Sequence, residues 1–138
     1  MDAEDILEKL VSFNTIKDKE NSKIISYIES YLLSYSFKTI YKDKLLVMTN
    51  GKEDLSDVKL AFVGHTDTVD STSGWTYDPF KLTKKDGKLI GLGSCDMKGG
   101  IAAILAAVPK VDFSLFKAKI MLVFTYDEEI GFSGIKDS

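Results

Sequence analysis

The sequence predicts an α/β fold with a mixed, largely parallel sheet flanked by helices. Two observations support this class. Segments with the apolar spacing of amphipathic helices alternate with short apolar runs that are typical of buried strands. No repeat, low-complexity stretch or internal linker interrupts this alternation. The length of 138 residues suits one hydrophobic core of ordinary size.

The first elements are two helices, predicted over about 6–13 and 20–34 because apolar residues recur there at helical spacing. The period then becomes that of strands, which we predict over 37–42 and 44–51. The run VKLAFVGH, residues 58–65, is nearly continuously apolar, which predicts a strand buried on both faces.

The second half continues the alternation. The pair Asp86-Gly87 lies between two strand-like runs and predicts a hairpin turn. Small residues over 98–108 predict a helix that can pack closely on a sheet, and 118–129 is the most strand-like stretch of the sequence.

Composition narrows the possible partners and location. The net charge of −3 does not favour binding to nucleic acid or to an anionic membrane, and no apolar run approaches the length of a membrane span. All 18 basic residues are lysines, so the chain cannot hold a substrate carboxylate with a bidentate arginine. The single cysteine, Cys95, and an acidic N-terminus without a signal peptide predict a cytoplasmic protein.

Three groups of potential ligands follow strand-like runs. His65 ends the run over 58–65, Asp96 follows the run KLIGLG over 88–93, and the pair Glu128 and Glu129 ends the last strand. If these strands are parallel, all three groups lie at one edge of the sheet, where open α/β sheets bind ligands. Histidine with carboxylates is the ligand set of zinc and similar metals.

Asp67 and the glutamate pair strengthen the prediction of a metal site. In an extended chain, residues two apart point the same way, so Asp67 is placed to accept a hydrogen bond from His65. Metal-bound histidines usually have such a partner. Of Glu128 and Glu129, one can hold metal while the other takes a proton from water.

Each feature also has another interpretation. A lone histidine is often structural, and an acidic run is often an exposed loop. GLGSCD resembles a dinucleotide fingerprint, but Asp96 replaces its third glycine. Cys95 lacks a second histidine to activate it, so we expect a small buried side chain there. The coincidence of the three groups favours metal.

Three motifs give the sequence a family resemblance: GHTDTV (64–69), GLGSCDMKGG (91–100) and TYDEEIG (125–131). Their order and spacing resemble the dinuclear zinc amidohydrolases, which include acetylornithine deacetylase, succinyl-diaminopimelate desuccinylase, aminoacylases, carboxypeptidases and dipeptidases. The last motif is most similar to acetylornithine deacetylase.

The resemblance implies a role for each matching residue. His65 would bind one of two divalent metal ions, zinc first and cobalt as an alternative, and Asp96 would bridge both. Asp67 would orient His65, Glu128 would be the general base, and Glu129 would bind the other metal. The family also implies a cis peptide bond after Asp96.

The resemblance also implies that parts of the enzyme lie outside this sequence. The family has a further carboxylate ligand, a second histidine and a lid domain that holds the substrate carboxylate and forms homodimers. Residues 1–138 would then be the N-terminal portion of a metallohydrolase catalytic domain, with an incomplete metal shell and no activity alone. Asp70 stands where the family usually has proline.

The function implied by this resemblance is hydrolysis of the amide bond of an N-acyl amino acid, with N-acetyl-ornithine as the first candidate. A di- or tripeptidase or carboxypeptidase is the alternative within the family. A non-catalytic metal-binding fragment and a non-functional remnant with exposed apolar surface are the alternatives outside it. The sequence assigns no substrate-binding residue.

Overall fold

The structure is a computed structural model, and it describes residues 2–16, 20–51, 58–71, 73–115 and 119–126. Its helices and strands follow one another along the chain in the order α1 (Ala3–Ser12), α2 (Asn21–Leu33), β1 (Phe37–Lys42), β2 (Leu45–Asn50), β3 (Val58–His65), β4 (Thr83–Lys85), β5 (Lys88–Ile90), α3 (Gly99–Ala107) and β6 (Lys119–Thr125). A π-type turn, η1 (Ser94–Lys98), precedes α3, and two 3-10 turns, η2 (Val108–Lys110) and η3 (Phe113–Leu115), follow it.

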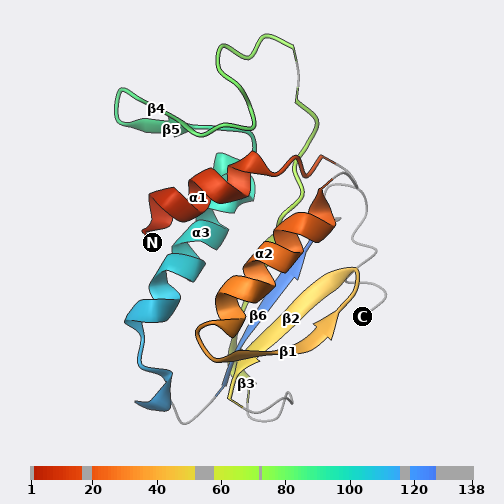
Figure 1. Cartoon of the computed structure of the whole chain (residues 1–138), viewed down its shortest axis with the longest axis vertical. Coiled ribbons are helices and arrows are strands. Elements are labelled where there is room, and N and C mark those ends of the chain that lie inside the picture. Colours follow the sequence, from red (N-terminus) through yellow and green to blue (C-terminus); the bar gives the residue numbers. More distant parts are fainter. Residues whose placement is uncertain (1, 17–19, 52–57, 72, 116–118, 127–138) are drawn as a thin grey trace.

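Four strands form the main sheet in the order β1-β2-β6-β3 (Figure 1). β1 pairs with β2, and β2 with β6, in antiparallel fashion, whereas β3 and β6 are parallel. The predicted mixed α/β class is confirmed. None of the helices among the described residues is long and apolar enough to cross a membrane.

The helices form where the sequence predicts them. Asp2 caps α1, because its carboxylate accepts a hydrogen bond from the Asp5 backbone N–H at 2.9 Å. α2 turns one apolar stripe inward, and this stripe includes Ile24, Ile28 and Leu32, each 0% exposed. Both helices thereby bury an apolar stripe.

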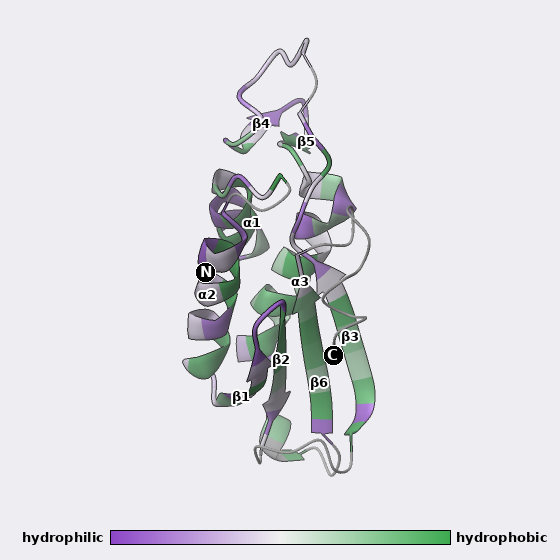
Figure 2. Ribbon diagram, turned by 90° about the vertical axis from the view of Figure 1, so that its right-hand side faces the viewer, coloured by the Kyte–Doolittle hydropathy of each residue, from purple (hydrophilic) through white to green (hydrophobic). Residues whose placement is uncertain are grey.

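The core lies between the sheet and the helices, which cover the same face of it (Figures 1 and 2). Side chains alternate along β2 and β6, so Met48 lies beside Leu122 and Leu46 beside Phe124 on this inner face. Burying each such side chain stabilises the fold by about 1.5–3 kcal/mol. This layer fixes the sheet on which the candidate site is built.

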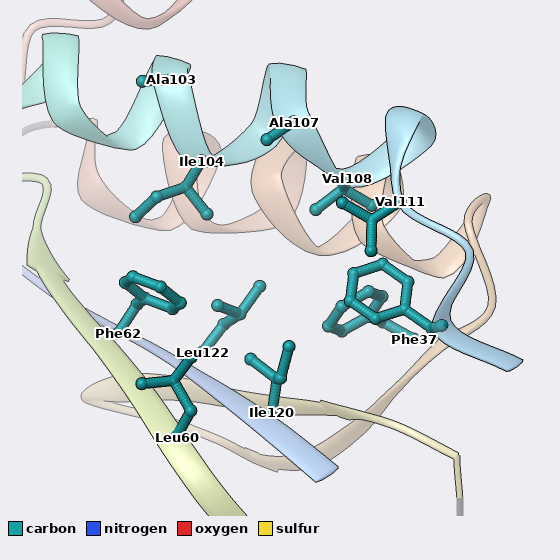
Figure 3. Close-up of a pocket in the computed structure, with 11 residues that line it drawn as sticks. Phe37, Leu60, Phe62, Ala103, Ile104, Ala107, Val108, Val111, Ile120 and Leu122 are labelled. Atoms are coloured by element: carbon teal, nitrogen blue, oxygen red, sulfur yellow. The ribbon is translucent and has the colours of Figure 1, made fainter. Parts of the chain in front are cut away.

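β3 corrects one prediction from the sequence. Its apolar run predicts burial on both faces, but β3 is the last strand of the described sheet, and Leu60, Phe62 and Val63 are 49%, 43% and 55% exposed. Leu60 and Phe62 line an apolar groove of about 420 Å³ between the sheet and α3 (Figure 3). The run is apolar, but in this chain its edge and part of each face stay open.

The hairpin β4–β5 brings a confirmation and a second correction. Asp86 and Gly87 have φ angles of 52° and 74°, as a tight hairpin turn of this kind requires, so the predicted turn is confirmed. The run over 88–93 was expected to join the main sheet. Its described strand, Lys88–Ile90, instead pairs only with β4 in a separate sheet.

The two edges of the main sheet differ in how well they resist pairing with another chain. Both edge strands carry a register irregularity, β1 between Thr39 and Tyr41 and β3 between Val58 and Leu60, but only β3 exposes a run of large apolar side chains that includes Phe62. We expect the 138-residue chain to self-associate through β3, because a long apolar edge promotes pairing. Phe62→Lys should make it monomeric, and Tyr41→Lys on β1 should not. Sedimentation velocity measures this, and a monomeric wild-type chain would contradict it.

Candidate metal centre

His65 lies at the carboxyl end of β3, where it pairs with Thr125 at the end of β6. The residue before it, Gly64, lets α3 approach the strand closely, since a Cβ at this position would lie 3.1 Å from Ile101 Cγ1. His65 is 9% exposed. The imidazole is therefore held at a fixed place between the sheet and the turn that precedes α3.

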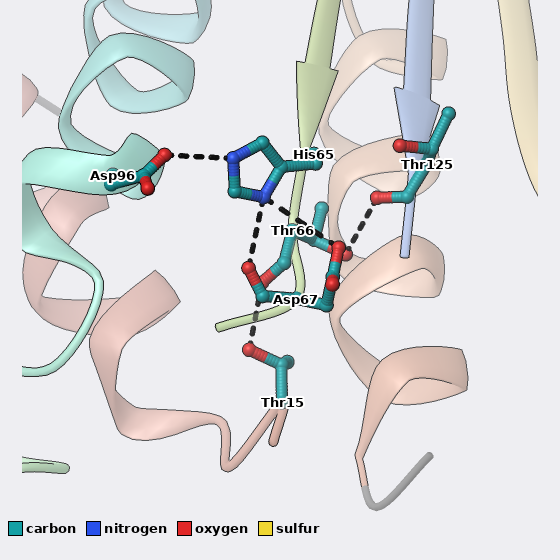
Figure 4. Close-up of polar contacts among 6 residues, drawn as sticks. All are labelled: Thr15, His65, Thr66, Asp67, Asp96 and Thr125. Carbon is teal, nitrogen blue, oxygen red and sulfur yellow. Dashed lines mark hydrogen bonds and ion pairs between the residues drawn. The ribbon is translucent and has the colours of Figure 1, made fainter. Parts of the chain in front are cut away.

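Two aspartates contact the ring from opposite sides (Figure 4). Nδ1 lies 2.9 Å from the backbone oxygen of Asp67 and 3.6 Å from its carboxylate Oδ1. Nε2 lies 2.8 Å from Asp96 Oδ1. Because Nδ1 is occupied by the hydrogen bond to Asp67, Nε2, which faces Asp96, is the ring nitrogen that would be available to a metal ion.

The charges around the ring stabilise its protonated form. The Asp67 carboxylate, and then Asp96, raise the pKa of His65 to about 9, against the opposing effect of burial. At neutral pH without metal, both ring nitrogens therefore carry a proton, and each donates a hydrogen bond to an aspartate oxygen. Binding of a metal at Nε2 must displace one of these protons.

Asp96 reaches the site from a turn and not from a strand of the main sheet. It belongs to η1, in which Asp96 and Met97 have non-helical backbone angles, and Gly93 before it has a φ of 77°. The peptide bond between Asp96 and Met97 is cis, as the family resemblance implies. The Asp96 side chain is 72% exposed, so the site opens to solvent on this side.

Of the three predicted groups of ligands, the structure describes two, His65 with Asp67 and Asp96. The structure brings His65, Asp67 and Asp96 together, while Glu128 and Glu129 lie outside the described residues and their roles stay predictions. β6 ends at Thr125, the residue that pairs with His65, so the chain leaves the sheet beside the histidine.

Within the described ranges, no group of three or more His, Cys, Asp or Glu side chains is arranged to hold a metal. The pair His65 and Asp96 nevertheless fits one chemically, because an imidazole nitrogen and a carboxylate oxygen face each other at 2.8 Å. The ring is also fixed from behind by Asp67, as metal-binding histidines usually are.

Another residue of the motif differs from its prediction. Cys95 was expected to be a small buried side chain, but it lies in η1 and is exposed.

Lys98, at the end of the same turn, had no predicted role. It is 1% exposed, and its ammonium donates to the Phe13 carbonyl at 3.0 Å. Burial lowers the pKa of Lys98 to about 8, against the opposing effect of Glu20. The sequence feature that could have indicated a buried role for Lys98 is its position directly before a helix of small apolar residues.

Comparison with known proteins places the chain in a family. Residues 61–137 match the family described as peptidase family M20/M25/M40. The chain belongs to this family. The matched region includes His65, Asp67 and Asp96 and begins within β3.

Curated M20 relatives align over most of the chain. It is 36% identical to acetylornithine deacetylase of Pasteurella multocida and 35% identical to that of Myxococcus xanthus, over 86% and 94% of its length. It is 33% identical to succinyl-diaminopimelate desuccinylase of a Sulfurovum species, over 94%. The chain spans about a third of these relatives, 32%, 36% and 34% of their lengths.

Solved structures show the same fold at lower identity. Human carnosine dipeptidase 1 matches 98% of this M20 chain with a TM-score of 0.81 and 20% identity, and the match covers 34% of that protein. An M20 family metallo-carboxypeptidase of Sulfolobus solfataricus matches 95% of the chain with a TM-score of 0.76 and 21% identity, over 32% of its own length. These matches confirm the fold class.

The site predicts a specific pattern of metal binding. Replacing His65 by alanine removes a nitrogen ligand. Loss of a residue that only hydrogen-bonds to a metal ligand already lowers metal affinity roughly tenfold or more, so the Zn²⁺ affinity of His65→Ala should fall by more than that. Asp112→Asn, which lies between η2 and η3 beyond the end of α3 opposite to η1, should leave affinity unchanged. Isothermal titration calorimetry compares the three proteins, and equal affinity of wild type and His65→Ala would contradict the site.

The turn before Asp96 has a steric requirement that can be tested against a matched glycine. A Cβ on Gly93 would overlap Thr68 Cγ2, whereas one on Gly87, also at positive φ, meets nothing within 4 Å. Gly87→Ala should cost about 1 kcal/mol of unfolding free energy from backbone strain. Gly93→Ala should cost roughly 1–3 kcal/mol more from the overlap. Urea unfolding measures both, and equal costs would show that the turn relaxes freely.

Proposed function

We propose that residues 1–138 form the N-terminal part of the catalytic domain of a metal-dependent amidohydrolase. The observation that supports this most is the His65–Asp96 pair, with an Nε2–Oδ1 distance of 2.8 Å and with Asp67 behind the ring. Membership of the M20 family supports the same chemistry. The roles given to these residues are those implied by the family motifs.

In this proposal His65 and Asp96 hold metal together with Glu129. A bound divalent metal supplies Lewis acidity for the amide carbonyl and lowers the pKa of a water molecule. Asp67 keeps the imidazole oriented and increases its basicity. Glu128 takes a proton from the attacking water and delivers it to the departing amine.

For the substrate we propose an N-acyl amino acid, and N-acetyl-ornithine first. Support comes from the names of two curated relatives, both acetylornithine deacetylases at 35–36% identity. The chain has 18 lysines and no arginine, so it offers only point charges and backbone N–H groups to a substrate carboxylate. Recognition of that carboxylate then belongs to residues outside this sequence.

Two other functions remain as alternatives. Peptide hydrolysis is favoured by the fold, because carnosine dipeptidase 1 has a TM-score of 0.81, although 20% identity shows fold alone. Metal binding without catalysis is favoured by the small number of potential ligands, because no third side chain joins His65 and Asp96 in a metal-binding arrangement among the described residues. Glu128 distinguishes this last case, because a binding protein does not need a general base.

Activity with two substrate classes tests the proposal. The zinc- or cobalt-loaded full-length protein should hydrolyse N-acetyl-ornithine, and Glu128→Gln should lower kcat by at least roughly 100-fold, the lower end of the contribution of a general base. Release of ornithine and of free amino acids from dipeptides is measured side by side. The isolated 138-residue chain should be inactive.

Each other outcome selects an alternative. Preference for dipeptides supports the peptidase. No hydrolysis of any acyl amino acid or dipeptide by metal-loaded full-length protein contradicts enzymatic function. An active protein that is indifferent to Glu128→Gln contradicts the role of Glu128. His65→Ala serves as the control for loss of metal.

A further inference from the structure

The connector between α1 and α2 contacts the loop that carries His65. Thr15, 1% exposed, donates from Oγ1 to the Thr66 carbonyl at 2.7 Å (Figure 4). The Thr15 carbonyl accepts from the Thr68 N–H at 3.2 Å. Ile16 and Thr68 form a parallel bridge. The connector therefore lies along the loop like a short extra strand.

From the other side, the end of β6 holds the same loop. The Thr66 N–H donates to the Thr125 carbonyl at 2.7 Å, and the Thr66 hydroxyl donates to that oxygen at 3.1 Å. Thr66 is 0% exposed. Its N–H is thus fixed by β6 and its C=O by the connector, so the backbone next to His65 cannot tilt without breaking a buried hydrogen bond.

The connector also holds the turn that carries Asp96. The buried ammonium of Lys98 donates to the Phe13 carbonyl at 3.0 Å, and the Lys98 N–H donates to the Gly93 carbonyl at 2.8 Å. A single short segment, residues 13–16, therefore binds both loops that present the facing ligands.

We propose that residues 13–16 are a brace that sets the position of His65 relative to Asp96, with Thr15 and Lys98 as its positioning residues. The inference takes from the proposed function only that His65 and Asp96 are a ligand pair. The Thr15 and Lys98 side chains hydrogen-bond to the backbone carbonyls of Thr66 and Phe13 and so act on the ligand pair through the backbone. A merely structural role predicts that their loss lowers stability alone.

His65 is the only histidine in the chain, so its ring protons give one unambiguous pair of signals in a 1H–13C NMR spectrum. The wild type should show one narrow pair. Thr15→Val removes the hydroxyl at nearly constant volume and should broaden or double this pair, because the ring loses a fixed position. Thr15→Ser keeps the hydroxyl and should restore the wild-type spectrum.

A matched control separates positioning from stability. Thr39→Val also removes one partly buried hydroxyl, which donates to Glu29 at 2.8 Å. Thr39 lies on β1, at the edge of the sheet opposite to β3. It should lower the thermal midpoint and leave the ring signals unchanged. Lys98→Met gives a second, independent variant in case Thr15→Val does not fold.

Titration of the same spectra with Zn²⁺ gives the functional readout. The apparent affinity should fall roughly tenfold in Thr15→Val and Lys98→Met, as for other outer partners of metal ligands. One narrow, unshifted pair of ring signals and an affinity within about twofold of wild type, in either variant that folds, would overturn the proposal. Because no substrate is present, an inactive full-length enzyme would not affect this result.

Discussion

β3 and β6 run parallel, so the chain that leaves the sheet at His65 must return to its opposite end before Lys119 can pair. α3 makes this return across the inner face, and Gly64 allows it to pack closely. The same pairing aligns His65 with Thr125, which brings the two strand ends to one place. Without it, the turn that carries Asp96 would have no fixed position relative to the histidine.

The site concentrates buried polar groups beside an apolar core, and such groups are costly unless they are paired. Thr66, Thr125 and Lys98 are each at most 1% exposed, and each has a hydrogen-bond partner at 2.7–3.1 Å. His65 is likewise held by two aspartates. These hydrogen bonds hold the backbone around His65 and Asp96 in place without a bound metal.

The candidate site and the exposed apolar surface share one strand. His65 ends β3, while Leu60, Phe62 and Val63 are open along it. A further strand paired along the whole of β3 would have one of its two ends beside the histidine, its carboxyl end if parallel and its amino end if antiparallel. The open edge of the described sheet and the candidate site therefore lie on the same strand.

The sequence by itself determined the features that depend on near neighbours. Helical periodicity located α1 and α2, turn chemistry located Asp86-Gly87, and the motif spacing selected His65 and Asp96. The periodicity and turn signals are local, because propensity acts within a few residues, whereas His65 and Asp96 were selected by the family resemblance of their motifs. The local signals also correctly placed Asp67 next to the imidazole.

Only the tertiary structure decided which distant segments meet. The turn chemistry located the β4–β5 hairpin but not its exclusion from the main sheet. The apolar run of β3 lies at an edge because its described partner, β6, is far along the chain. Thr15 bonds a carbonyl 51 residues away, and Lys98 one 85 residues away. No local pattern marks such contacts, because packing of the whole core brings them together.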